Sequence, residues 1–132
     1  MTKLNAIVAV LFASFMLATP GGAAMAQPST QQVKETLANT AIDHARFLIS
    51  VKRFDEAREV LIEVLLDKSL PDETIGRALL QKGNLGMHTR DYKGAKREYQ
   101  SALDLAGISA QLRRAAKDGF DMAESFEKLR QK

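Results

Sequence analysis

Histidine and carboxylate side chains are the residues of this chain whose types would allow catalysis or metal binding. The two histidines, His44 and His88, lie far apart, and neither belongs to a His-x-x-x-His or His-Glu-x-x-His pattern that places two ligands on one helix face. A group of acidic residues does recur at helical spacing: Asp55, Glu56, Glu59 and Glu63. Because Arg53 and Arg58 accompany this group, we expect a solvated face with ion pairs rather than an acid–base or metal site.

Other catalytic patterns are missing from the sequence. The chain has no cysteine, which excludes thiol nucleophiles, thiolate metal sites and disulfides. The segment 83–86 has two glycines but lacks the Lys and Ser or Thr of a phosphate-binding loop, and no Gly-x-Ser-x-Gly occurs. We therefore predict that the protein is not an enzyme and has no cofactor or bound metal.

Basic side chains offer a different chemistry, the attraction of anionic partners. The chain has 19 Lys and Arg against 16 Asp and Glu, a formal net charge of +3. Residues 27–72 contain 6 basic and 8 acidic residues, whereas residues 73–132 contain 12 basic and 8 acidic residues. The later half either attracts an acidic partner or anionic lipid headgroups, or only keeps the protein soluble. Nucleic acid is not an expected partner at so small a charge.

The first 26 residues have the pattern of a secretory signal peptide. Lys3 precedes an apolar run from Leu4 to Ala18, and Ala24-Met25-Ala26 offers the small residues that a signal peptidase recognises. The run has roughly 15 residues, fewer than the roughly 20 that a membrane-spanning helix needs. We predict a cleaved signal at 1–26, a domain at 27–132, and a periplasmic protein, secreted if there is no outer membrane. An uncleaved anchor is the alternative.

Five stretches with apolar residues at three- and four-residue steps predict an all-α domain. The expected helices span residues 32–51, 54–67, 71–88, 92–105 and 110–129. Ser29 and Gln32 form a capping pattern before the first helix, and Ser109 starts the last. Gly107 is expected to close the fourth helix, as glycine often does beyond a helix end.

Two of these helix pairs share a sequence pattern. Segments 52–61 and 89–99 each contain a polar turn, an aromatic residue, an alanine and a large apolar residue four places later. The two alanines, Ala57 and Ala95, are 38 residues apart, a period typical of helical repeats. The segment 90–105 resembles the second half of a tetratricopeptide repeat. Residues matching that family's packing positions are Ala95, Tyr99 and Ala102, with Leu79 and Gly83 before them and Ala45, Leu48, Ala57 and Leu61 in the earlier copy.

The resemblance implies a right-handed α-solenoid with units at about 38–71 and 76–109 and a capping helix at about 110–130. The period exceeds the family's usual value of about 34 residues, and His44, Lys82 and Gly86 replace large apolar residues. The three glycines of the third helix each cost about 1 kcal/mol relative to alanine, so that helix either packs closely or is loose. The capping helix would cover the last pair with an apolar stripe: Leu112, Ala115, Ala116, Gly119, Ala123, Phe126 and Leu129.

In the tetratricopeptide family the first helix of each pair lines a concave groove that binds a partner's peptide or helix. The resemblance assigns this role here to Asn39, Ile42, Arg46, Ile49, Arg77, Leu80, Asn84, Met87 and His88. Arg113, Ala116 and Phe120 are expected to extend the groove. A carboxylate clamp is not expected, because Ile42 and Arg46 occupy the places of that subtype's Lys and Asn. The alternative is that these residues only pack against the next helix.

The sequence therefore predicts a non-catalytic periplasmic adaptor or scaffold with a protein or peptide partner. Two other functions stay open. One is a self-associating structural component of the cell envelope, joined through apolar residues at the open ends of the array. The other is a basic surface that binds anionic membrane or cell-wall polymer, in which case binding would weaken with added salt.

Overall fold

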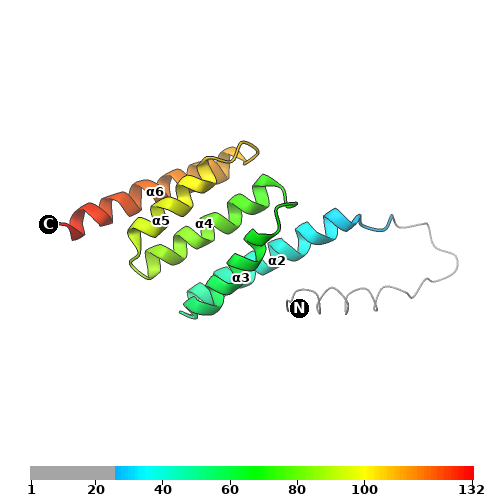
Figure 1. Ribbon diagram of the computed structural model, residues 1–132, viewed down its shortest axis with the longest axis horizontal. Helices are drawn as coiled ribbons and strands as arrows, with labels where there is room; N and C mark the ends of the chain where they lie inside the picture. The colour runs from blue at the N-terminus through cyan, green and yellow to red at the C-terminus, as the bar shows by residue number, and fades with distance from the viewer. Residues whose placement is uncertain (1–25) are drawn as a thin grey trace.

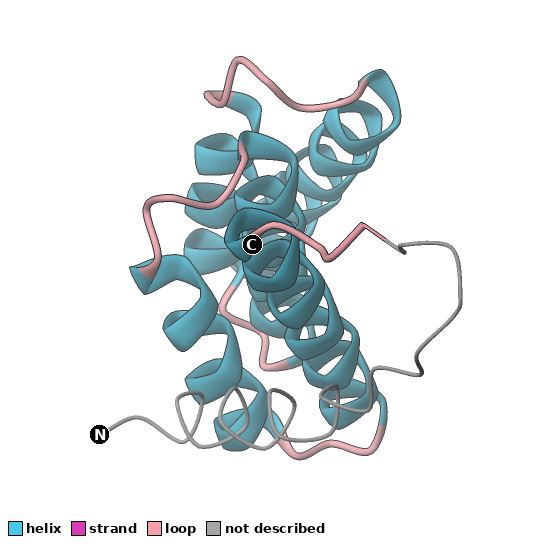
Figure 2. Cartoon of the chain, turned by 90° about the vertical axis from the view of Figure 1, so that its right-hand side faces the viewer, coloured by secondary structure: helices cyan, strands magenta, loops and turns pink. Residues whose placement is uncertain are grey.

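The computed structural model describes residues 26–132, which form five α-helices. The helices are α2 (Thr30–Ser50), α3 (Phe54–Leu66), α4 (Asp72–His88), α5 (Tyr92–Leu103) and α6 (Ala110–Arg130). Figure 1 shows them as successive neighbours in one array, and Figure 2 shows only helices and loops in this part of the chain. The all-α prediction is confirmed, with helix ends within two residues of the expected ones. The predicted signal segment lies outside the described residues, apart from Ala26.

Side chains just outside the helices fix where the helices begin. The Ser29 hydroxyl oxygen accepts a hydrogen bond from the Gln32 amide at 3.2 Å, and Gln32 Oε1 accepts one from the Ser29 amide at 2.8 Å. This is the capping box that the sequence predicted. Asp91 and Ser109 cap α5 and α6 in the same way, each accepting from the amide three residues later.

The turn between α2 and α3 recurs 38 residues later between α4 and α5. Lys52 and Arg90 occupy its equivalent positions, with φ of 63° and 62°, in the left-handed region that non-glycine residues seldom adopt. In both turns an amide donates to the carbonyl oxygen five residues earlier at 2.8 Å, Arg53 to Leu48 and Asp91 to Gly86. The two helical hairpins therefore share one turn geometry at the period of the sequence repeat.

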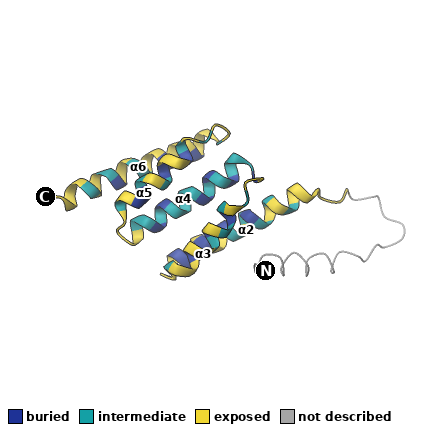
Figure 3. Cartoon of the chain, viewed as in Figure 1, coloured by how far each residue is buried: buried dark blue, intermediate teal, exposed yellow. Residues whose placement is uncertain are grey.

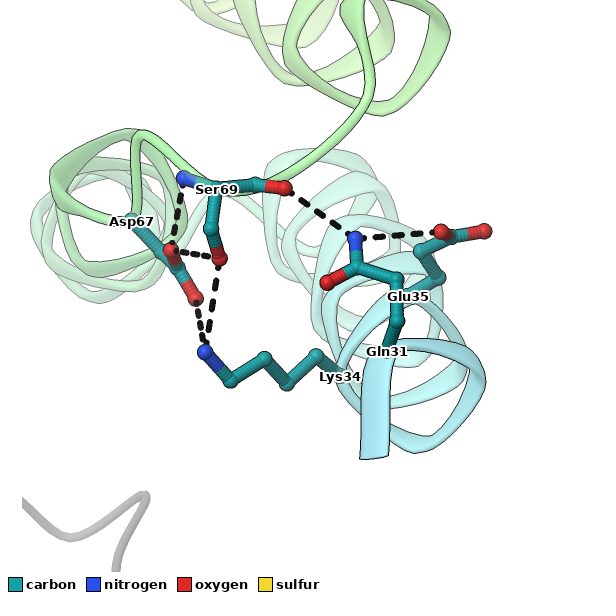
Figure 4. Close-up of polar contacts among 5 residues, drawn as sticks. All are labelled: Gln31, Lys34, Glu35, Asp67 and Ser69. Carbon is teal, nitrogen blue, oxygen red and sulfur yellow. Dashed lines mark hydrogen bonds and ion pairs between the residues drawn. The ribbon is translucent and has the colours of Figure 1, made fainter. Parts of the chain in front are cut away.

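The first turns of α2 are tied to the loop between α3 and α4 (Figure 4). Gln31 Nε2 donates to the Ser69 carbonyl oxygen at 3.0 Å, and Lys34 Nζ donates to the Ser69 hydroxyl oxygen at 3.3 Å. Lys34 Nζ also lies 3.9 Å from Asp67 Oδ2. The hydroxyl and the amide of Ser69 both donate to the Asp67 carboxylate, and these bonds lower its pKa. The loop is thus held by a group of mutually bonded side chains.

An equivalent contact joins the first turn of α4 to the loop between α5 and α6. Glu73 accepts hydrogen bonds from the Ser109 amide at 2.6 Å and from its hydroxyl at 2.9 Å. The Gly107 amide donates to Asp72 Oδ2 at 2.8 Å. The prediction that Gly107 closes the preceding helix is wrong, because α5 already ends at Leu103 and Gly107 does not adopt a left-handed conformation. This glycine instead lets the loop approach α4.

The helices lie in two layers. Helices α2, α4 and α6 contact one another in succession, and we call them the inner layer; α3 and α5, each of which packs against two of these helices, we call the outer layer. Helix α4 contacts all four other described helices, whereas α3 and α5 do not contact each other. The buried residues in Figure 3 follow the sides on which neighbouring helices meet.

Tyr99 of α5 fills the space between α4 and α6. Its side chain is 1% exposed, and glycines on both inner helices make room for the ring. A Cβ atom at Gly83 would lie 2.7 Å from Tyr99 Cδ1, and one at Gly119 would lie 2.6 Å from Tyr99 Cζ. Gly76 likewise faces the side chain of Leu112. The glycines of α4 therefore allow close packing, which is one of the two outcomes that the sequence left open.

Helix α6 covers the preceding pair only in part. Leu112, Ala116 and Ala123 are buried as expected, but Ala115 is exposed, and Phe126 and Leu129 are 44% and 65% exposed. The prediction that the last two residues cover the core is wrong, because α5 has only 12 residues and begins at Tyr92 beside Phe126, whereas α6 has 21. The last turns of α6 extend beyond the helix that would bury them.

Candidate functional site

The surface between α2 and α4 in the inner layer carries a polar network. Arg77 of α4 donates from Nη1 to Asn39 Oδ1 of α2 at 2.6 Å, and its Nη2 lies 3.4 Å from Asp43 Oδ1. Arg46 lies 3.6 Å from the same carboxylate oxygen. Two guanidinium groups therefore share one carboxylate, and this surface has an excess of positive charge with unused N–H donors.

Ile42 and Ile49 do not belong to this surface, contrary to the prediction. They are 1% and 5% exposed, Ile42 in a core cluster with Leu61 and Ile49 in a cluster with Leu85. Residues at three- and four-residue steps cover a broad arc of a helix surface. The predicted stripe on α2 therefore includes residues on the side that packs against α3 and α4. A partner cannot reach these isoleucines unless the core opens.

Leu80, Met87 and Asn84 support the packing of α5 on α4. The two apolar side chains are half-buried against the cluster around Tyr99 and Ala123. The Tyr99 hydroxyl donates to Asn84 Oδ1 at 2.7 Å. Burial raises the pKa of Tyr99 to about 12, so this hydroxyl stays a neutral donor near neutral pH. For these three residues the structure shows packing on the next helix, which was the alternative that the sequence left open.

His88 is exposed at the end of α4. Its ring stacks on Phe54 of α3, with ring centroids 6.2 Å apart and an angle of 27° between the planes. The imidazole therefore contacts α3 at the end of α4 and stays open to solvent. We define the inner polar surface as the Arg77 network on α2 and α4 together with the exposed His88: Asn39, Asp43, Arg46, Arg77 and His88.

The expected extension onto α6 is largely used within the fold. Ala116 is buried, and Phe120 packs on the Tyr99 cluster with Lys96 Nζ 5.6 Å from its ring centroid. Arg113 donates to the carbonyl oxygens of Leu103 and Leu105 at 2.9 and 3.1 Å. Its guanidinium thus binds the negative end of α5, which limits the inner polar surface to α2 and α4.

A second candidate region, which the sequence did not predict, lies where α5 begins and α6 ends. A shallow cleft of about 410 Å³ is lined by Arg90, Tyr92, Phe126, Leu129 and Arg130. The rings of Tyr92 and Phe126 stack with centroids 5.4 Å apart. The sequence contained one signal for this region. The apolar stripe of the last helix continues to Phe126 and Leu129, and we predicted that these residues belong to the core.

Both regions present charged and polar side chains to solvent. Among the described residues, no three His, Asp or Glu side chains gather closely enough to hold a metal ion. No helix in residues 26–132 combines the length and the apolar character needed to cross a membrane. Comparison with protein-family models, curated proteins and solved structures gives no match to this chain. The chemistry of its own surfaces is therefore the guide to function.

Proposed function

We propose that this chain is a non-catalytic adaptor of the tetratricopeptide type, which binds an acidic segment of a partner protein on its inner polar surface. The observation that carries the proposal is the pair Arg46 and Arg77 on adjacent helices, for which Asp43 is the only carboxylate partner in the described part of the chain. The repeat architecture is supported by the recurring turn at Lys52 and Arg90 and by the alternation of inner and outer helices.

The geometry favours an extended segment with a carboxylate. The side chain of Arg46 is 68% exposed, so a partner carboxylate reaches its guanidinium without displacing core residues. Arg77 is held in place by Asn39 at 2.6 Å, which fixes its remaining donors toward the incoming segment. A charge-assisted hydrogen bond of this kind contributes about 1.5–3 kcal/mol. Because the surface covers only two helices, the affinity is modest unless the partner is multivalent.

The proposed place of action is the periplasm, or the exterior where no outer membrane exists. The charged, apolar and small-residue order of residues 1–26 supports this proposal. Intact mass measurement and N-terminal sequencing of the protein from cells test it. A mature chain that begins at Gln27 is the expected result, and a chain that retains residues 1–26 would contradict cleavage.

Site-specific photocrosslinking in cells tests the binding face. A photoreactive amino acid replaces Arg46 or His88 on the inner polar surface, and in matched controls it replaces Arg97 or Ser101, which are exposed on α5. We expect one partner to be crosslinked from positions 46 and 88 and not from 97 and 101. Adducts only from the α5 positions, or no adduct from any position, would contradict the proposal.

A further inference from the structure

The outer face of α3 combines acidic and large apolar side chains in one stripe. Four residues at three- and four-residue steps form this acidic stripe: Glu59, Ile62, Glu63 and Leu66. Leu66 is 70% exposed and Ile62 is 43% exposed. Within the described chain neither glutamate makes an ion pair, in contrast to Asp55 and Glu56, which pair with Arg58 and Arg53. Two apolar side chains and two carboxylates without an ion-pair partner in the described residues therefore lie on one side of α3, with Glu63 half-buried and the other three exposed.

The cleft between α5 and α6 has the opposite charge. We define the basic cleft by Arg90, Tyr92, Lys93, Phe126, Leu129 and Arg130. In the part of the chain that is described, Arg90, Lys93 and Arg130 form no ion pair, and Arg130 donates only to the Arg90 carbonyl oxygen at 3.3 Å. The neighbouring carboxylates are engaged elsewhere, since Asp91 caps α5 and Glu127 binds Lys96 at 2.9 Å. The apolar floor therefore has a cationic rim.

We propose that the acidic stripe of one molecule binds the basic cleft of a second copy of this chain. In such a contact Ile62 and Leu66 cover the exposed parts of Phe126 and Leu129, while Glu59 and Glu63 meet the cationic rim. Burial of paired apolar side chains supplies the stabilisation, and the charges fix orientation and exclude contacts between like surfaces.

The contact has to form between molecules. Among the described helices, α3 touches only α2 and α4, and α5 and α6 lie on the far side of α4 (Figure 1). Since the two surfaces differ, the contact is heterologous, and each pair of bound copies leaves one stripe and one cleft free. The assembly therefore grows head to tail as concentration rises. Two short helical stripes make a small interface, so the association is weak and reversible.

Complementary charge reversal tests this proposal by sedimentation velocity over a concentration series. One variant carries Glu59→Lys and Glu63→Lys, and the other carries Lys93→Glu and Arg130→Glu. We expect each variant alone to weaken self-association at least tenfold relative to wild type. A mixture of the two variants should associate again, because each then offers a stripe and a cleft of opposite charge to the other. Controls with the same number and sign of charge reversals are Asp104→Lys with Asp118→Lys, and Arg114→Glu with Lys117→Glu. These exposed positions lie at the end of α5 and in the first half of α6, away from both surfaces.

The other outcomes are equally decisive. Wild-type protein that stays monomeric at all accessible concentrations overturns the proposal. Self-association that survives Glu59→Lys with Glu63→Lys but is lost with Lys93→Glu and Arg130→Glu indicates a cleft-to-cleft dimer and also overturns it. Circular dichroism shows whether each variant is folded, and restored association in the mixture independently shows that both are. The inner polar surface is not altered, so partner crosslinking at positions 46 and 88 reports separately on the adaptor function.

Discussion

Replacing Gly83 with alanine tests whether the Tyr99 ring sets the distance between α4 and α6. The new Cβ atom would lie 2.7 Å from Tyr99 Cδ1 and 2.8 Å from Cζ. Carbon atoms in contact are normally about 3.5–4.0 Å apart, so the ring or the helix has to move by about 1 Å. The ring has little freedom, because Gly119 of α6 approaches its other side and Asn84 holds its hydroxyl at 2.7 Å.

Two opposing effects decide the result of Gly83→Ala. Overpacking a filled core costs about 1–3 kcal/mol, whereas replacing a helical glycine by alanine contributes about 1 kcal/mol of stability. Because Tyr99 is confined on both sides, we expect the cost to lie in the upper part of that range, about 2–3 kcal/mol, and the net loss in the free energy of unfolding to be about 1–2 kcal/mol.

Urea unfolding followed by circular dichroism measures this change in two backgrounds. In Tyr99→Leu the ring is absent, so Gly83→Ala should stabilise that variant by up to about 1 kcal/mol. The sign of the effect therefore reverses between wild type and Tyr99→Leu. An equal stabilisation in both backgrounds would refute the idea that the ring determines the spacing of α4 and α6.

Three further predictions concern the turns and the titrating groups. Lys52→Gly should raise the free energy of unfolding, measured in urea, by up to about 1 kcal/mol, because glycine adopts the left-handed conformation freely. A loss of stability would contradict the turn geometry. The lowered pKa of Asp67 stabilises the fold above about pH 4, and this contribution is lost as the pH falls through the folded-state pKa; Asp67→Asn should therefore flatten the acid side of the stability curve. The raised pKa of Tyr99, about 12, means that stability is lost as the pH rises from about 10 toward 12; Tyr99→Phe should lessen this alkaline loss, and an unchanged alkaline slope would contradict it.

The helices and their period were predictable because they depend on local signals. Ser29 and Ser109 are N-cap residues that indicate where two helices begin, and the three- and four-residue spacing of apolar residues identifies each helix. The equivalence of the two hairpins was visible in Ala57 and Ala95, which are both fully buried. The left-handed turn residues were not predictable from type, because lysine and arginine have no preference for that conformation.

The site was predicted less well because it depends on how helices pack. Spacing placed Asn39, Ile42 and Arg46 on one stripe, but only contact with α3 and α4 decides which edge of that stripe is buried. Asp43, which links Arg46 to Arg77, lies next to the stripe and was not selected.

Predicting the basic cleft would have required knowing where α5 begins relative to α6. Phe126 and Leu129 continue the apolar stripe of α6 without a break, so the sequence pattern favours burial. Their exposure follows from the position of Tyr92, where α5 begins and its cover of α6 ends. A pattern within one helix cannot show where its neighbour begins.

The affinity of the purified protein for the partner crosslinked at position 46 tests the central claim most directly. Calorimetry compares wild type with Arg46→Glu and with Arg97→Glu, which makes the same charge change on the outer layer. Loss of a charge-assisted contact of about 1.5–3 kcal/mol predicts a dissociation constant at least tenfold weaker for Arg46→Glu. Arg97→Glu should stay within about twofold of wild type, since long-range charge effects are screened. Equal affinities for all three proteins would contradict partner binding on the inner polar surface.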